Sequence, residues 1–182
     1  MGKSIGLLEL KSIPIGIESA DAMLKAANVE LLVATPICPG KYVVMIGGQV
    51  GAVKSAMEAG QQVAGTFLVV HHTINNVHES VPAALMGTTE TEQIASLGVI
   101  ETMSALTAVL AGDIAAKASK ITLMEIRIAR GLGGKGYVIF TGEISSVKSA
   151  VKSCVGQLAD TGEITSSCVI ASPHPGLLDK LD

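Results

Sequence analysis

The chain contains one sequence unit twice, and this duplication constrains the fold more than any other feature. Residues 5–9, IGLLE, are similar to residues 97–101, LGVIE, and the run Val-Lys-Ser-Ala at 53–56 recurs unchanged at 147–150. The other matched pairs are Asp21 with Asp113, Lys25 with Lys117, Lys41 with Lys135, and His78 with His174. We therefore expect two domains of the same fold, over residues 4–88 and 96–182. The polar segment between them is typical of a linker.

Each unit combines short apolar runs with stretches of helical periodicity, which is typical of an α+β fold. In the first unit, apolar runs predict strands over residues 6–10, 29–35, 41–47 and 66–74. A helix with one apolar face is predicted by Ile13, Ile17, Ala20, Leu24 and Ala27, a second helix begins near Val50, and a short helix closes the unit. This order predicts two tandem domains, each an antiparallel four-stranded sheet with helices packed on one face.

The composition narrows the classes of partner. Only 16% of the residues are charged, against about 25% in ordinary soluble domains, so we expect subunits to bury much of the surface. The net charge of -3 and the lack of a basic stripe with aromatic residues argue against nucleic acid. The apolar runs are too short to span a membrane, and the start of the chain has no secretory pattern, so we expect a cytoplasmic protein.

Two long segments carry a resemblance to a known family. The strings DAMLKAANVELLV and PGKYVVMIGGQVGAVKSAMEAG resemble the bacterial microcompartment shell domain, and GDIAAKASKITL with GGKGYVIFTGEISSVKSAV resembles it in the second unit. The resemblance covers nearly the whole chain. It implies a homotrimer that mimics a hexamer and joins other shell proteins in the shell of a microcompartment within the cytoplasm. No Ser/His/Asp set, carboxylate pair or phosphate loop indicates an enzyme.

The segment TPICPGK, residues 35–41, resembles the pore loop of those shell proteins whose pore cysteine binds a 4Fe-4S cluster, and that cysteine matches Cys38. Independently of the family, Pro36 and Pro39 stiffen this loop and Gly40 permits a close turn, which predicts an exposed thiol at a bend. One thiol cannot hold a cluster, which needs three or four thiolates. A threefold axis would supply three, leaving water or another small ligand on the fourth iron.

The matching loop of the second unit has Leu132 in place of Cys38, so each trimer would present three pore thiols. The expected pore loop comprises Ile37, Cys38, Pro39, Gly40, Gly131, Leu132, Gly133 and Gly134. On this hypothesis the cluster passes electrons across the shell or is delivered to an encapsulated redox enzyme. The alternative is a plain structural tile whose open pore passes small metabolites and in which Cys38 has no role.

The other sulfur and imidazole groups favour structural roles. Cys154 lies at helical spacing with Val147, Val151 and Leu158, which predicts a core residue. For Cys168, within a predicted strand at 164–171, we expect packing rather than ligation. Adjacent strand residues face opposite sides, so His71 and His72 are expected to be polar strand residues and not a metal pair.

The resemblance also assigns a shell edge. The family's matching lysine lies between neighbouring oligomers, so we expect that role for Lys25 and Lys117. The family's edge arginine is replaced by Asn76 in the first unit and by Ser172 in the second. We therefore expect this protein to need other shell proteins around it in order to tile.

Overall fold

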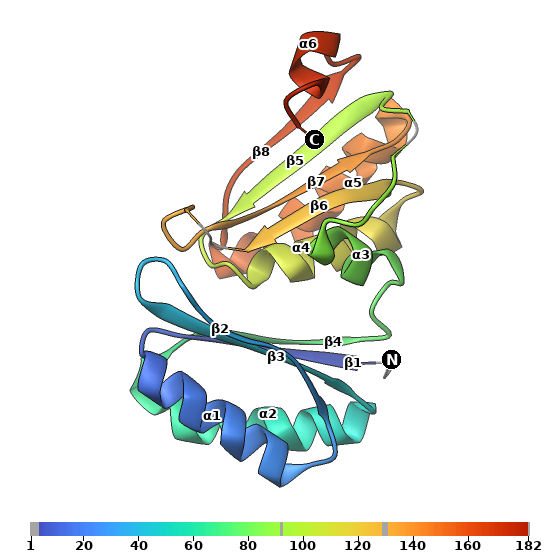
Figure 1. Ribbon diagram of the computed structural model, residues 1–182. Helices are drawn as coiled ribbons and strands as arrows, with labels where there is room; N and C mark the ends of the chain where they lie inside the picture. The colour runs from blue at the N-terminus through green and yellow to red at the C-terminus, as the bar shows by residue number, and fades with distance from the viewer. Residues whose placement is uncertain (1–3, 92, 129–130, 182) are drawn as a thin grey trace.

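The two repeats fold into two four-stranded antiparallel sheets, which confirms the predicted α+β class (Figure 1). The computed structural model describes residues 4–91, 93–128 and 131–181. The first domain contains β1 (Ser4–Leu10), α1 (Ile13–Ala26), β2 (Glu30–Ile37), β3 (Lys41–Gly48), α2 (Val50–Ala64), β4 (Leu68–Asn75) and α3 (Ser80–Met86). The second contains β5 (Ser96–Thr102), α4 (Thr107–Ala118), β6 (Thr122–Ile128), β7 (Gly136–Thr141), α5 (Ile144–Gln157), β8 (Ile164–Ala171) and α6 (Pro175–Leu178).

The strand orders are β2-β3-β1-β4 in the first sheet and β6-β7-β5-β8 in the second, so the two domains share one topology. The registers also correspond: Leu7 of β1 lies opposite His72, and Val99 of β5 lies opposite Cys168. The residues of β1 and β4 therefore have definite counterparts in β5 and β8. Among the described helices, none is both long and apolar enough to cross a membrane.

Each sheet has one face covered by the two long helices of its own domain, and we call the other face its open face. Strand residues alternate between these faces. Leu8, Val44 and Ile46 pack beneath α1 and α2, whereas Leu7 and Met45 point to the open face. Both groups are buried, so something outside the first domain must cover its open face.

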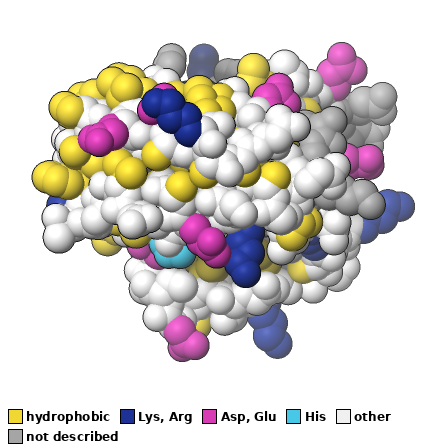
Figure 2. All heavy atoms as spheres, turned by 90° about the horizontal axis from the view of Figure 1, so that it is seen from below, with side chains coloured by type: hydrophobic (Ala, Val, Ile, Leu, Met, Phe, Trp, Pro, Cys, Tyr) yellow, Lys and Arg dark blue, Asp and Glu magenta, His cyan; other side chains and the backbone are white. Residues whose placement is uncertain are grey.

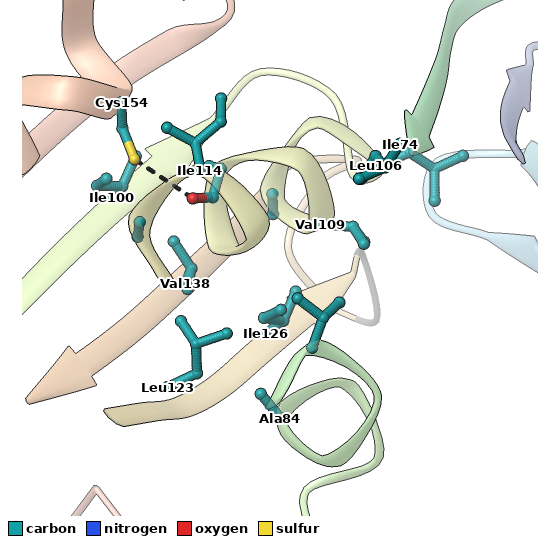
Figure 3. Packing of buried hydrophobic residues seen from close by; sticks show 14 of the residues in the cluster. Ile74, Ala84, Ile100, Leu106, Val109, Ile114, Leu123, Ile126, Val138 and Cys154 are labelled. Atoms are coloured by element: carbon teal, nitrogen blue, oxygen red, sulfur yellow. Dashed lines mark hydrogen bonds between the residues drawn. The ribbon is translucent and has the colours of Figure 1, made fainter. Parts of the chain in front are cut away.

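That cover is the second domain. Figure 1 shows α3 and α4 lying between the two sheets. The residues Leu7, Met45 and Ile74 of the first sheet share one buried cluster with Leu106 and Val109 at the beginning of α4, and Figure 3 draws several members of this cluster. The chain is therefore layered as helices, sheet, helices, sheet, and the open face of the second sheet has no such cover among the described residues.

The apolar face expected for α1 lies largely outside the core. Its buried residues are Gly16, Ser19, Ala20 and Met23, whereas Ile13, Ile17 and Leu24 are exposed. Gly16 lets the helix approach the sheet closely, because a Cβ there would lie 2.5 Å from the ring of Tyr42. Figure 2 views the molecule from the side of α1 and α2, and hydrophobic side chains lie among the charged ones on this surface.

Candidate functional site

The turn between β2 and β3 carries Cys38. Ile37, the last residue of β2, is buried, and its carbonyl accepts a hydrogen bond of 3.0 Å from the Gly40 N–H. Gly40 has φ of +88°, a conformation that favours glycine. The strand extends further than predicted, since Pro36 pairs with Tyr42 on an edge strand, where a missing N–H is tolerated. Cys38 is exposed, which confirms the expected thiol at a bend.

The two expected pore loops lie against each other. In the second domain, Gly133 and Gly134 have φ of +61° and +90°. A Cβ on Gly134 would lie 3.1 Å from Lys41 Nζ and 3.2 Å from the backbone oxygen of Cys38. The fold therefore brings the cysteine loop and the matching loop of the other domain into direct contact.

A buried ion pair joins β3, the strand that follows the cysteine loop, to β1. Lys41 Nζ lies 2.7 Å from Glu9 Oε1, and the Glu9 side chain is fully buried. The other oxygen, Oε2, accepts a hydrogen bond of 3.1 Å from the Leu106 N–H at the start of α4. Sequence reasoning did not single out this pair, although both residues recur in the second repeat, and that recurrence was the available signal.

The counterpart pair is Glu101 and Lys135, 2.9 Å apart and much more exposed. Thr165 Oγ1 also donates to Glu101 Oε1 at 2.6 Å. The hydrogen bond from Thr165, followed by that from Lys135, lowers the pKa of Glu101. The second domain thus satisfies this carboxylate from its own residues, whereas Glu9 takes a partner from the other domain.

Comparison with known proteins agrees with this doubled architecture. The family model described as "BMC domain" matches residues 4–77 and again 96–173. The chain belongs to the bacterial microcompartment shell protein family. The bacterial microcompartment shell protein PduT of Citrobacter freundii is 41% identical over 177 residues, which span 97% of this chain and 96% of that protein. A carboxysome shell protein, CsoS1B of Halothiobacillus neapolitanus, is 38% identical over 92 residues, 49% of this chain and 84% of that protein.

Solved structures show the same arrangement. A microcompartment protein from Desulfitobacterium hafniense superposes with a TM-score of 0.86 at 45% identity, covering 97% of this chain and 98% of that chain. The fused permuted hexameric shell protein MSM0275 gives a TM-score of 0.66 at 20% identity, with 87% and 82% covered, and so supports the fold alone. The chain is thus a component of a microcompartment shell, and the family is one of structural shell proteins that assemble with one another.

The two remaining cysteines of this shell protein differ in burial. Cys154 is buried, its thiol donates to the Ala111 carbonyl at 3.3 Å (Figure 3), and burial raises its pKa to about 12. This confirms the prediction of a core residue. Cys168 is exposed, so the expected packing is wrong within one chain. The reason is that nothing in the described chain covers the open face of β8.

The donor set of one chain does not suffice for a metal cluster. Within the described residues, no group of three or more His, Cys, Asp and Glu side chains could hold a metal ion. Cys38 offers one exposed thiol, and the adjoining loop contributes Leu132 where a second thiol would be needed. The thiol chemistry fits an iron–sulfur cluster only when several chains bring their Cys38 loops together.

His72 joins the two domains of the shell protein. Its Nε2 lies 2.9 Å from Thr107 Oγ1, and that hydroxyl donates to Glu163 Oε2 at 3.1 Å. Ser104 is also buried and hydrogen-bonds both Thr107 and Glu163. Burial lowers the pKa of His72. His71, on the opposite side of the strand, is exposed.

The two expected edge lysines have different surroundings. Lys25 pairs with Asp21 at 2.5 Å on an exposed helix face. Lys117 pairs with the buried Asp113 at 2.6 Å and also donates to the Asn75 carbonyl at 3.1 Å, across the domain boundary. Asp113 further accepts the His78 N–H at 2.8 Å. Lys117 therefore lies at the rim of the contact between the two domains.

Proposed function

We propose that three copies of this shell protein close into a ring of six domains, and that the three Cys38 thiols meet at its centre to hold one 4Fe-4S cluster. The observation that carries this proposal is the contact between the cysteine loop and the loop around Gly134. If neighbouring domains meet in the same way all around a ring, every such loop lies next to the axis. Cys38 and Leu132 then alternate around it.

The layering of the chain supports ring closure. The open face of the first sheet covers α4. Two surfaces stay exposed in the single chain: the outer side of α1, which is the counterpart of α4, and the open face of the second sheet. Placing the second sheet of one chain on α1 of the next repeats the internal contact. Such a head-to-tail interface uses two different surfaces, and it closes into a ring when the rotation allows. The family resemblance implies six domains, hence three chains.

The turn residues and the ion pair beside them would position the thiol in this assembly. The turn at Gly40 exposes the Cys38 thiol, and the ion pair between Glu9 and Lys41 fixes the beginning of β3, just after the turn, to β1. Thiolate sulfur is a soft ligand suited to iron–sulfur clusters. A bound cluster would supply one-electron transfer through the shell, or would be delivered to a redox enzyme inside it.

At the outside of the ring, Lys25 and Lys117 would face neighbouring oligomers. Asn76 and Ser172, in place of the family's arginine, share the same unusual backbone conformation, with φ of 50°. They offer no cation for contacts between tiles. Other shell proteins would therefore complete the facet around this trimer.

A second candidate is a plain tile whose open pore passes small metabolites. It is favoured by the donor set of the described residues, since each chain brings a single thiol to the loop and no further ligand beside it. Under this reading the ring is the same, and only the occupant of the pore differs.

Anaerobic purification with native mass and iron and sulfide quantitation tests the proposal. We expect a trimer with about four iron and four sulfide ions per three chains. Cys38→Ser should keep the trimer and lose both ions, because a serine hydroxyl is a hard and poorly ionised ligand. A monomer at micromolar concentration contradicts the ring. A trimer without iron after anaerobic reconstitution supports the open pore instead.

A further inference from the structure

We infer that the ring has two chemically different interfaces, and that in the one between chains Cys168 packs against Ile15 and Phe67 of the next copy. This inference rests on the proposed ring. The intrachain interface joins the first sheet to α4, and the interchain interface would join the second sheet to α1. Their chemistry differs so that each sheet accepts only one of the two helices.

The strand registers define which residues correspond. His72 lies opposite Leu7, and Cys168 lies opposite Val99, so Cys168 occupies the place of His72. The residue before the last strand corresponds in the same way. Phe67 O accepts the Lys11 N–H at 2.9 Å, and Glu163 O accepts the Met103 N–H at 2.7 Å. Phe67 therefore stands where the second domain has Glu163.

The intrachain interface is polar at this point. His72 reaches Thr107, and Thr107 and Ser104 both hydrogen-bond Glu163. Ser104 and Thr107 are buried, so their hydroxyls depend on these partners. The first sheet thus brings an imidazole to a buried hydroxyl and carboxylate on the second domain.

The interchain interface has less polar residues at three of the four corresponding places, and only Ser104 has a polar counterpart, Ser12. Cys168 replaces the imidazole, Phe67 replaces the carboxylate, and Ile15 replaces the hydroxyl of Thr107. The outer surface of α1 is uncovered in the single chain. Ile17 is 55% exposed, whereas its counterpart Val109, beneath the first sheet, is fully buried. A second copy of the chain offers the matching sheet face.

An independent difference between the two interfaces agrees with this assignment. Glu9 on the first sheet accepts the Leu106 N–H of α4. The counterpart of Leu106 at the start of α1 is Pro14, which has no N–H to donate. On the second sheet, Glu101 is satisfied by Thr165 of its own domain, where the first domain has Val69. Each carboxylate is thus matched to the helix that its sheet would meet.

Wrong pairings would leave buried polar groups without partners. The first sheet on α1 would place His72 against Ile15 and Phe67, and Glu9 against Pro14. The second sheet on α4 would place Cys168 instead of His72 against Thr107, so the hydrogen bond between His72 and Thr107 would be lost. Both arrangements lose hydrogen bonds without replacing them, which is a common basis of specificity. Chains therefore join only head to tail, so that first and second domains alternate around the ring.

The test uses the full chain with Cys38→Ser, so that the pore thiol does not interfere. Cys168 should resist a thiol reagent in the native oligomer, and it should react in denaturant. Cys168→His should raise the dissociation constant of the ring at least tenfold, since the new imidazole would be buried against Ile15 and Phe67 without a hydrogen-bond partner. Adding Phe67→Glu and Ile15→Thr to that variant should restore assembly, because it transplants the intrachain set. Ser167→His, on the opposite side of the same strand, is the matched control and should leave assembly unchanged.

The outcomes separate this inference from the proposed ring. A parent chain that stays monomeric overturns the ring itself. A trimeric parent in which Cys168 reacts as fast as a free thiol, or in which Cys168→His assembles normally, overturns the interface while leaving the ring intact. Circular dichroism of each variant verifies that the chain still folds.

Discussion

The Leu106 N–H donates a hydrogen bond of 3.1 Å to Glu9 Oε2, and this bond joins the first strand of one domain to the first helix of the other. The same carboxylate binds Lys41, the residue that follows the cysteine turn. A carboxylate at the beginning of a helix also interacts favourably with the helix dipole. Glu9 therefore couples the position of the cysteine loop to the packing of the two domains.

Glu9→Gln should destabilise the chain by about 1–3 kcal/mol, because Lys41 is largely buried and would lose its counter-charge. Glu101→Gln is the matched control. It removes the corresponding pair from a half-exposed site and should have a much smaller effect. Chemical denaturation of both variants measures the difference, and equal losses of unfolding free energy would contradict the proposed importance of the buried pair.

Cys154→Ser should lower the free energy of unfolding, since it replaces a thiol packed in an apolar cluster with a smaller and more polar hydroxyl. The loss is about 1–3 kcal/mol if the shorter side chain does not reach the Ala111 carbonyl that the thiol binds. The substitution should leave the iron content of the anaerobic trimer unchanged. Cys38→Ser should do the reverse, since its side chain is exposed and contributes little to the core. Melting temperature and iron content are measured for both variants together. Loss of iron from Cys154→Ser would argue against the pore site.

Stability should decrease as the pH falls below about 6.5, the ordinary pKa of histidine. Burial holds the pKa of His72 lower in the folded protein, with Glu163 opposing this effect and His71 adding to it. The unfolded chain therefore binds the proton more readily, and protonation favours unfolding. His72→Gln should flatten the dependence between pH 5 and 7. Urea midpoints at a fixed protein concentration measure it, and identical pH profiles would count against this role.

Lys117→Ala should destabilise the chain, by about 1–3 kcal/mol, because the buried Asp113 would lose its charged partner. Lys25→Ala should leave unfolding nearly unchanged, because the pair with Asp21 is exposed. As an edge residue, Lys25 should instead affect the joining of trimers to neighbouring shell proteins. Electron microscopy of shells assembled together with other shell proteins tests this, and normal incorporation of Lys25→Ala would exclude the edge role.

Much of the fold followed from local patterns. Alternating and helical periodicities predicted the order of strands and helices, because each reflects how often a side chain returns to the same face. Proline and glycine around Cys38 predicted an exposed turn, and helical spacing placed Cys154 in the core. The partners of Glu9 were not predictable in this way, since Lys41 and Leu106 are far from it in sequence and meet it only after both domains pack.

The sequence by itself determined that this protein has two copies of one α+β unit and that only one copy carries a thiol at the turn. These properties depend on residue identity and on short-range spacing. Only the tertiary structure decided which apolar faces are covered. Val109 is buried because the first sheet lies over α4, while its counterpart Ile17 is exposed because no second sheet lies over α1 in the same chain. Periodicity shows that a face is apolar, but burial depends on which other surface the chain brings against it.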